Sequence, residues 1–201
     1  MPTILADIPP VRPAPPSPPR KLWTRAECSA LEAAGLLDGQ HLELIEGDLI
    51  NKMGKNLPHL VSLGVLMNRL KGMFGEWFVL QEASIDVAPE DNPTNEPEPD
   101  IIVLKREFTS LSAIPRPEDL HLVVEIADTT LRFDLTTKAA LYARAGIVGY
   151  WVLDVTGRRL IVHRDPRNGV YSSIVEYRER EEVSPLAAAH VALRVSDAFA
   201  A

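Results

Sequence analysis

The chain is poor in cysteine and in long apolar runs. With Cys28 the only cysteine among 201 residues, an intramolecular disulfide and a cysteine-based zinc site are both excluded. No run of residues approaches the roughly 18 apolar side chains that a membrane-spanning helix requires. The first residues also lack the basic start, apolar stretch and small-residue cleavage site of a secretory signal. We therefore expect a cytoplasmic protein.

Positive charge is also scarce. Lys and Arg number 21 against 28 Asp and Glu, which gives a formal net charge of −7. A protein that binds nucleic acid over its whole surface neutralises phosphates with a broad basic face. The composition of this chain argues against such a protein. A local basic groove remains compatible with it. Carboxylates gathered around divalent cations would also raise the acidic count, because bound ions cancel part of that charge.

Proline is abundant but unevenly placed. Eight of the 17 prolines lie within residues 1–20, a segment without a periodic apolar pattern. Such a composition predicts an extended, mostly disordered tail. The remaining residues, 21–201, have ordinary globular statistics and are long enough for one well-filled core. We expect them to form a single domain.

Hydrophobic periodicity predicts a mixture of helices and strands. Apolar spacing and capping residues, among them Thr24 and Asp134 as N-caps, predict a first helix that begins at residue 24 and ends at Gly35 or Gly39, and further helices at residues 56–74 and 134–146. Strands are predicted as a hairpin over residues 41–51 and at 77–87, 99–104, 121–127, 148–154, 159–163 and 170–175, with a last strand or short helix in 185–199. The strand, helix, strand order over residues 121–154 predicts a crossover between parallel strands. The fold class is therefore α/β (α+β), with a mixed central sheet flanked by helices.

Two carboxylates interrupt predicted buried strands. Glu125 is flanked by Val124 and Ile126, and Asp100 directly precedes an apolar run. A buried carboxylate is rare unless it is paired or bound to a cation. If both side chains point to one place while Lys138 approaches from the following helix, the three groups outline a Mg²⁺ or Mn²⁺ site. Such ions take oxygen ligands, and the lysine would add positive charge beside a developing negative charge.

The order and spacing of several short motifs resemble a known family. These motifs are Glu43-Leu44-Ile45-Glu46-Gly47, His59, Pro99-Asp100, Val124-Glu125-Ile126, Asp134 with Lys138, Leu141-Tyr142-Ala143-Arg144-Ala145-Gly146 and Tyr150-Trp151. Together they resemble the Uma-two family of restriction-endonuclease-like proteins, within the PD-(D/E)XK nuclease superfamily. The resemblance covers residues 23–177.

This resemblance implies a restriction-endonuclease-like core and hydrolysis of DNA that depends on Mg²⁺ or Mn²⁺. Asp100 and Glu125 would bind the metal, and Glu43 resembles an extra acidic residue that ligates metal or orients a water. The superfamily usually places a lysine two residues after the glutamate, where this chain has Ala127. The resemblance therefore implies that Lys138, on the following helix, assists the attacking water.

Each of these residues also has a structural interpretation. Asp100 and Glu125 could form an ion-pair network with Lys138 or Arg132 without any metal, because structural networks also collect opposite charges. Glu43, on a predicted hairpin strand, could simply face water. The alternative to a metal site is therefore a set of ordinary ion pairs.

Two functions follow from these interpretations. The first is a metal-dependent endonuclease acting on DNA, for which we expect a homodimer, because two sites cut both strands and symmetric dimers are the common oligomer. The second is a catalytically silent nuclease-fold module that acts in DNA binding or protein interaction.

His59, in the first turn of a helix, is typical of a capping or surface residue, and Asp134 is most simply a helix cap.

Overall fold

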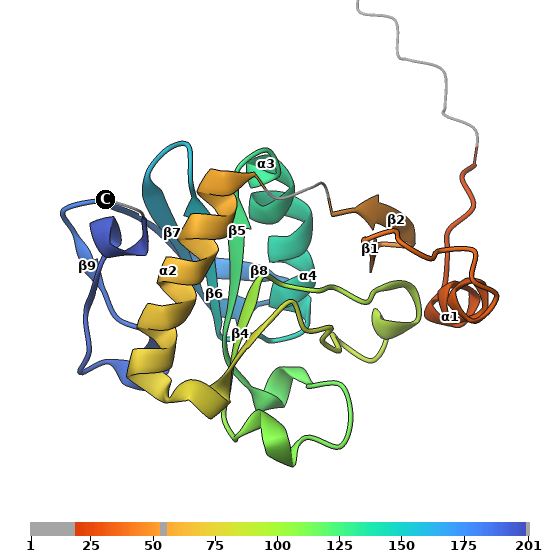
Figure 1. Ribbon diagram of the computed structural model, residues 1–201, viewed down its shortest axis with the longest axis horizontal. Coiled ribbons are helices and arrows are strands. Elements are labelled where there is room, and N and C mark those ends of the chain that lie inside the picture. Colours follow the sequence, from red (N-terminus) through yellow and green to blue (C-terminus); the bar gives the residue numbers. More distant parts are fainter. Residues whose placement is uncertain (1–18, 53–55, 200–201) are drawn as a thin grey trace, which may run out of the picture.

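The structure, a computed structural model, describes residues 19–52 and 56–199 (Figure 1). The predicted extended tail, residues 1–20, therefore lies almost entirely outside the described residues. Within the two described ranges, no helix combines the length and the apolar character needed to cross a membrane.

A six-stranded sheet forms the centre of the molecule, in the order β3-β4-β5-β6-β7-β8. Its strands are β3 (Val79–Gln81), β4 (Ile101–Leu104), β5 (Leu120–Ala127), β6 (Gly149–Asp154), β7 (Arg159–Arg167) and β8 (Val170–Arg178). Strands β5 and β6 are parallel, and the other four neighbouring pairs are antiparallel. The sheet is therefore mixed, which confirms the predicted fold class and the parallel pair on either side of the third helix.

Helices cover both faces of this sheet. Helix α2 (Leu57–Phe74) crosses one face, and α4 (Ala139–Arg144) lies against the other (Figure 1). Because alternate side chains of a strand point to opposite faces, β5 divides its apolar residues between the two cores. Val124 and Ile126 pack in the core on the α2 side, whereas Val123 and Ala127 pack on the α4 side. Glu125 therefore has to point toward α4.

A hairpin and a short helix lie to one side of the sheet (Figure 1). Helix α1 (Arg25–Ala33) begins with the predicted capping box, in which Thr24 is the N-cap. The hairpin of β1 (Leu42–Ile45) and β2 (Asp48–Asn51) turns through Glu46 and Gly47, whose φ angles of 52° and 77° suit a tight two-residue turn. The first helix and this hairpin confirm the sequence prediction.

The predicted strand over residues 77–87 is wrong over most of its length. The structure has a 3₁₀ turn, η1 (Glu76–Phe78), followed by β3, which ends at Gln81. Glu82 adopts a positive φ of 49°, outside the extended region, and the regular ladder with β4 ends there. The residues that follow keep only scattered backbone hydrogen bonds to the segment before β4, from Glu82 to Asp100 and from Ile85 to Pro97.

The predicted helix cap at Asp134 is also wrong. Helical structure begins three residues earlier, in α3 (Leu131–Phe133), with Thr130 as the N-cap residue. It continues through a π-helical segment, η5 (Asp134–Lys138), into α4. Asp134 therefore lies inside a helical segment. The predicted end is correct, because α4 stops at Arg144 and Gly146 follows with a φ of 73°.

Short elements complete the described chain. Two strands, β9 (Glu182–Val183) and β10 (Leu193–Arg194), pair antiparallel and include the last strand that the sequence predicts. The remaining 3₁₀ turns are η2 (Asn92–Thr94), η3 (Phe108–Ser110), η4 (Pro117–Asp119), η6 (Leu186–Ala188) and η7 (Val195–Ala198).

One histidine is buried in the α4-side core. His163, on β7, is only 1% exposed, and its ring lies 5.1 Å from that of Tyr150 and 5.4 Å from that of Tyr171, centroid to centroid. Its Nδ1 atom has no hydrogen-bond partner within the part of the chain that the structure describes. Burial lowers the pKa of His163 to about 4, because the charged imidazolium would lose its hydration.

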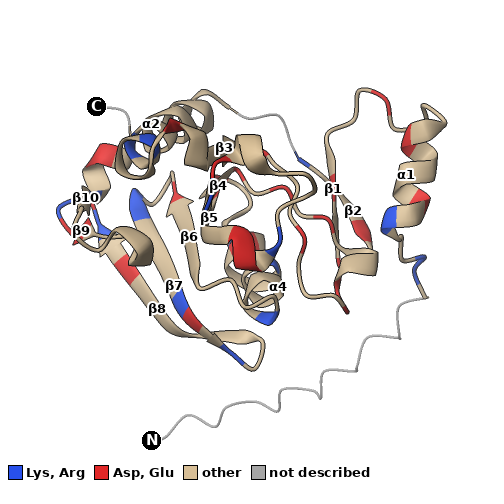
Figure 2. Cartoon of the chain, turned by 90° about the horizontal axis from the view of Figure 1, so that it is seen from below, with Lys and Arg blue, Asp and Glu red and all other residues tan. Residues whose placement is uncertain are grey.

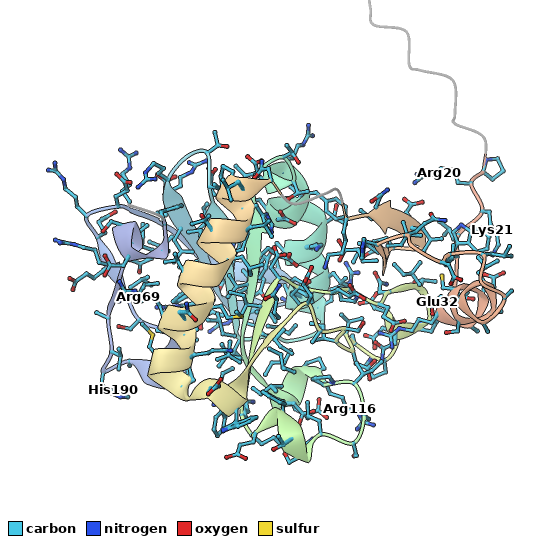
Figure 3. All side chains as sticks on the ribbon, in the orientation of Figure 1. Arg20, Lys21, Glu32, Arg69, Arg116 and His190 are labelled. Carbon is cyan, nitrogen blue, oxygen red and sulfur yellow. The ribbon has the colours of Figure 1, made fainter. Side chains whose placement is uncertain are left out.

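Replacing His163 by Phe should weaken the acid sensitivity of the fold. The unfolded chain binds a proton at His163 near pH 6.5, and the folded chain does so only near pH 4. The unfolding free energy therefore has its full value above pH 6.5 and falls as the pH drops toward 4. Between pH 7 and pH 4.5 the wild type should lose about 2 kcal/mol more unfolding free energy than His163→Phe. Urea unfolding at both pH values measures this. The matched control is His190→Phe, at an exposed site labelled in Figure 3, and equal pH dependence in wild type and His163→Phe would contradict the prediction.

Candidate active site

The four predicted site residues meet at one cavity. It has a volume of about 270 Å³ and lies where β1 and β2, the N-terminal end of α2, the start of β4, the end of β5 and η5 come together. Glu43, Asp100, Glu125 and Lys138 all line it, with exposed fractions of 5%, 5%, 4% and 3%. Residues from four distant parts of the sequence therefore share one nearly buried place.

Glu125 is held by two donors from the helical side. Its Oε1 atom accepts a hydrogen bond from Lys138 Nζ at 3.0 Å and another from the Tyr142 hydroxyl at 2.9 Å. Burial raises the pKa of Glu125 well above its ordinary value, Lys138 opposes this, and neighbouring carboxylates raise the pKa further. Burial likewise raises the pKa of Tyr142, so its hydroxyl keeps the proton that it donates. The site favours a cation next to Glu125.

Lys138 lies between two carboxylates. Its Nζ atom is 2.9 Å from Glu43 Oε1 and 3.0 Å from Glu125 Oε1. Burial lowers the pKa of Lys138, but the two carboxylates outweigh this and raise the pKa above its ordinary value. Lys138 therefore stays protonated at neutral pH and acts as a fixed positive charge.

The π-helical segment sets the direction of Lys138. The Ala139 N–H donates to the carbonyl of Asp134, five residues earlier, and the Tyr150 hydroxyl donates to the same carbonyl at 3.0 Å. A π turn adds one residue to the helix and rotates the side chains that follow it, and such turns are frequent at functional sites. Tyr150 fixes this turn from the sheet. The sequence pattern did not indicate it.

Asp100 is anchored to the neighbouring strand. It directly precedes β4, and its Oδ2 atom accepts a hydrogen bond from the Ile126 N–H at 2.8 Å. The antiparallel register of β4 and β5, with Ile101 opposite Val124, brings Asp100 to the end of β5 that carries Glu125. The pairing of two strands therefore places both carboxylates at the same edge of the cavity.

Glu43 reaches the site from the side hairpin, which is the hairpin of β1 and β2 beside the sheet. It lies on β1, and its Oε2 atom accepts a hydrogen bond from the Glu98 N–H at 3.3 Å. A backbone hydrogen bond from Glu96 to Leu44, of 2.7 Å, ties the hairpin to the segment before β4. Glu43 is buried against Lys138, so the interpretation that it faces water is wrong.

His59 also lies at the cavity. Asn56, the N-cap of α2, accepts a hydrogen bond from the His59 N–H at 3.0 Å and donates one to Asp128, after β5. This places His59 Nε2 3.4 Å from Asp100 Oδ1. His59 therefore faces the candidate site, although the sequence pattern favoured a capping or surface role.

Asp134 is a neighbour of the site and not a cap. Thr130 Oγ1 donates to Asp134 Oδ2 at 2.6 Å, and Asp134 lines the cavity. Burial raises the pKa of Asp134 to about 6, while the charge of Lys138 opposes the shift. Another carboxylate thus adds negative charge around Lys138.

The ion-pair network expected as the alternative to a metal site is present in part: Lys138 pairs with Glu125 as expected, but its second partner is Glu43, while Asp100 lies beside His59. Arg132 is exposed and does not contribute. Across residues 19–52 and 56–199, no three His, Cys, Asp or Glu side chains form a ready-made cation site. The donor chemistry nevertheless suits Mg²⁺, which prefers carboxylate oxygens and is usually held by one or two of them together with waters and substrate phosphates.

Sequence reasoning assigned no site role to two aromatic residues. The first is Tyr142, whose hydroxyl donates a hydrogen bond to Glu125. The spacing of Lys138 and Tyr142, four residues apart on a helix, was the available signal, because such residues share a helix face. Phe133, one residue before η5, lines the cavity wall, and no sequence pattern marked it.

Comparisons with known proteins identify the family and the fold of the chain. The Uma2 family, described as "Putative restriction endonuclease", matches residues 26–196. A crystal structure of a protein from Anabaena variabilis, described as a "putative nuclease belonging to DUF820", superposes with a TM-score of 0.64 at 17% sequence identity, over 80% of this chain and 90% of that one. That likeness shows a shared fold. No curated protein matches the chain. Because the family match spans most of the sequence, the chain belongs to the Uma2 family.

Proposed function

We propose that this protein hydrolyses DNA phosphodiester bonds with the help of Mg²⁺ or Mn²⁺. The observation that carries the proposal is the placement of Asp100, Glu125 and Glu43 around one cavity, with the protonated Lys138 between two of them. Three buried carboxylates, those of Glu43, Glu125 and Asp134, surround the single charge of Lys138. A second cation that shares the site would offset this excess of negative charge.

Asp100 and Glu125 are the proposed metal ligands, with Glu43 as a third acidic contributor. When bound, the metal would polarise the phosphate and lower the pKa of a coordinated water. The hydrogen bond from Ile126 orients Asp100, and those from Tyr142 and Lys138 orient Glu125. Groups held in this way need little rearrangement as charge develops.

Lys138 supplies a positive charge in this mechanism. Because the neighbouring carboxylates raise its pKa, it does not release a proton at neutral pH and is not a general base. It assists instead by stabilising negative charge on the attacking water and on the phosphate oxygens. The low exposure of the site excludes bulk water, which strengthens this electrostatic effect.

A catalytically silent nuclease-fold module is the second candidate function. The observation that favours it is that Lys138 already contacts two of the three carboxylates, in the absence of a three-ligand group among the described residues. Titration of Mg²⁺ and Mn²⁺ by calorimetry separates the two candidates. Saturable binding that is lost in Asp100→Asn supports the enzyme, and no binding by the folded wild type supports the silent module.

Asp100→Asn should lower Mg²⁺- or Mn²⁺-dependent cleavage of DNA on the order of 100-fold, because an amide is a poor ligand for these ions. The fold should persist, since the amide oxygen can still accept from Ile126. The assay measures cleavage of plasmid and single-stranded DNA. Asp154→Asn is the matched control, because Asp154 is equally buried but does not line the cavity. Equal losses in both variants would remove Asp100 from the mechanism.

Lys138→Met should destabilise the protein by about 3–5 kcal/mol at pH 10, because Glu43 and Glu125 lose their buried cation. The loss should be smaller at pH 7. Without the lysine the raised pKa of Glu125 rises further, so as the pH falls from 10 the variant's carboxyl takes up a proton before the wild type's does, and its buried charge disappears. Urea unfolding at the two pH values measures this, with the exposed Lys105→Met as the control. The same loss at both pH values would show that charge is not the cause.

A further inference from the structure

We propose that the cavity receives an unpaired nucleotide, so that the substrate is single-stranded DNA or an unpaired segment within a duplex. This rests on the proposed nuclease function and specifies its substrate class. Three observations support it: the depth of the reactive groups, an aromatic wall beside them and the excess of acidic over basic side chains among the described residues that line the cavity.

The reactive groups are too deep for an ordinary duplex contact. Asp100, Glu125 and Lys138 are each at most 5% exposed, and the cavity above them holds about 270 Å³. This is at the small end of the range of pockets that enclose a single small ligand. Duplex DNA is stiff and keeps its bases stacked, whereas an unpaired nucleotide can leave the strand and enter a small pocket. The size of the cavity therefore favours one nucleotide.

Phe133 gives the cavity an aromatic wall. It is half-buried, lines the cavity beside Asp134, and packs against the small apolar cluster of Ile45, Val87 and Leu141. Bases without a pairing partner stack on aromatic side chains, and this stacking is the usual source of affinity for single strands. The amide side chain of Asn51 lines the same cavity and offers a donor and an acceptor to a base edge, whereas the Asn56 amide already caps α2 and binds Asp128. Aromatic and amide groups thus lie beside the carboxylates.

The charge around the cavity does not suit a duplex. Among its lining residues, Lys52 and Lys138 are outnumbered by five acids, Glu43, Asp100, Glu125, Asp128 and Asp134. Figure 2 shows Lys and Arg scattered over the described chain, and Figure 3 shows Arg20, Lys21 and Arg116 at the periphery of the molecule. Proteins that hold a duplex through its backbone make many cationic phosphate contacts. A short unpaired segment, bound partly by stacking, needs fewer of them.

The test compares one DNA sequence in three forms: a single strand, a perfect duplex, and a duplex with an unpaired tract. Cleavage is followed in Mg²⁺ and in Mn²⁺. Binding is followed separately by fluorescence anisotropy in Ca²⁺, which takes the same kind of oxygen ligands. The wild type should cleave the single strand and the unpaired tract at least about tenfold faster than the duplex.

Phe133 variants test the stacking wall. Phe133→Leu should weaken binding of the single strand about fivefold to tenfold, the effect expected from losing most of one base–aromatic stacking interaction. Leucine preserves the apolar packing, and Phe133→Trp should retain the affinity. The matched control is Phe108→Leu, which replaces a half-buried phenylalanine in η3, away from the cavity. Thermal unfolding confirms that the variants remain folded.

The outcomes separate this inference from the proposed function. Cleavage of the duplex as fast as the single strand would overturn the inference and leave the nuclease function intact. Unchanged single-strand binding by Phe133→Leu would also overturn it. If the folded wild type neither binds nor cleaves DNA in any form, both proposals fail together.

Discussion

The buried contact of Lys138 with Glu43 and Glu125 is the interaction on which the site depends. Its three members come from the side hairpin, the central sheet and the π-helical segment, so one ion-pair cluster joins three separately formed pieces of structure. Removing these charges from water costs several kcal/mol, which only close and complete pairing offsets. Such a cluster tolerates little displacement. The cavity beside it therefore has a defined shape.

Strand geometry explains how a lysine on a helix can serve this site. Glu125 and Ala127 lie on the same face of β5, because side chains two apart on a strand share a face. A lysine at position 127, where the superfamily resemblance would place it, would point from the strand toward α4. Alanine there packs in the core below the helix, and Lys138 reaches Glu125 from above. The structure therefore brings a lysine charge to Glu125 from the helix and not from the strand.

The sequence predicted site residues where a charged side chain falls in a strand that should be buried. It did not predict features that depend on contacts between distant segments of the chain. Glu125 was conspicuous because a carboxylate within an aliphatic strand needs a partner, and the structure supplies one. The prediction that Asp134 is a helix cap was wrong. Aspartate favours helix N-caps, whereas here it lies within the π-helical segment. That segment is fixed by Tyr150 from another strand, which no local pattern encodes. The approach of His59 to Asp100 depends in the same way on where α2 begins.

The nature of the substrate also bears on the predicted homodimer. A homodimer follows from the chemistry of cleavage only if both strands of a duplex are cut, because each strand then needs its own site. The carboxylates and Lys138 that make up the candidate site all belong to one chain and line one cavity, which under the proposal receives one nucleotide. An unpaired strand requires a single such site. If the substrate is unpaired DNA, the reaction gives no reason for a dimer, and the prediction rests only on the general frequency of symmetric pairs.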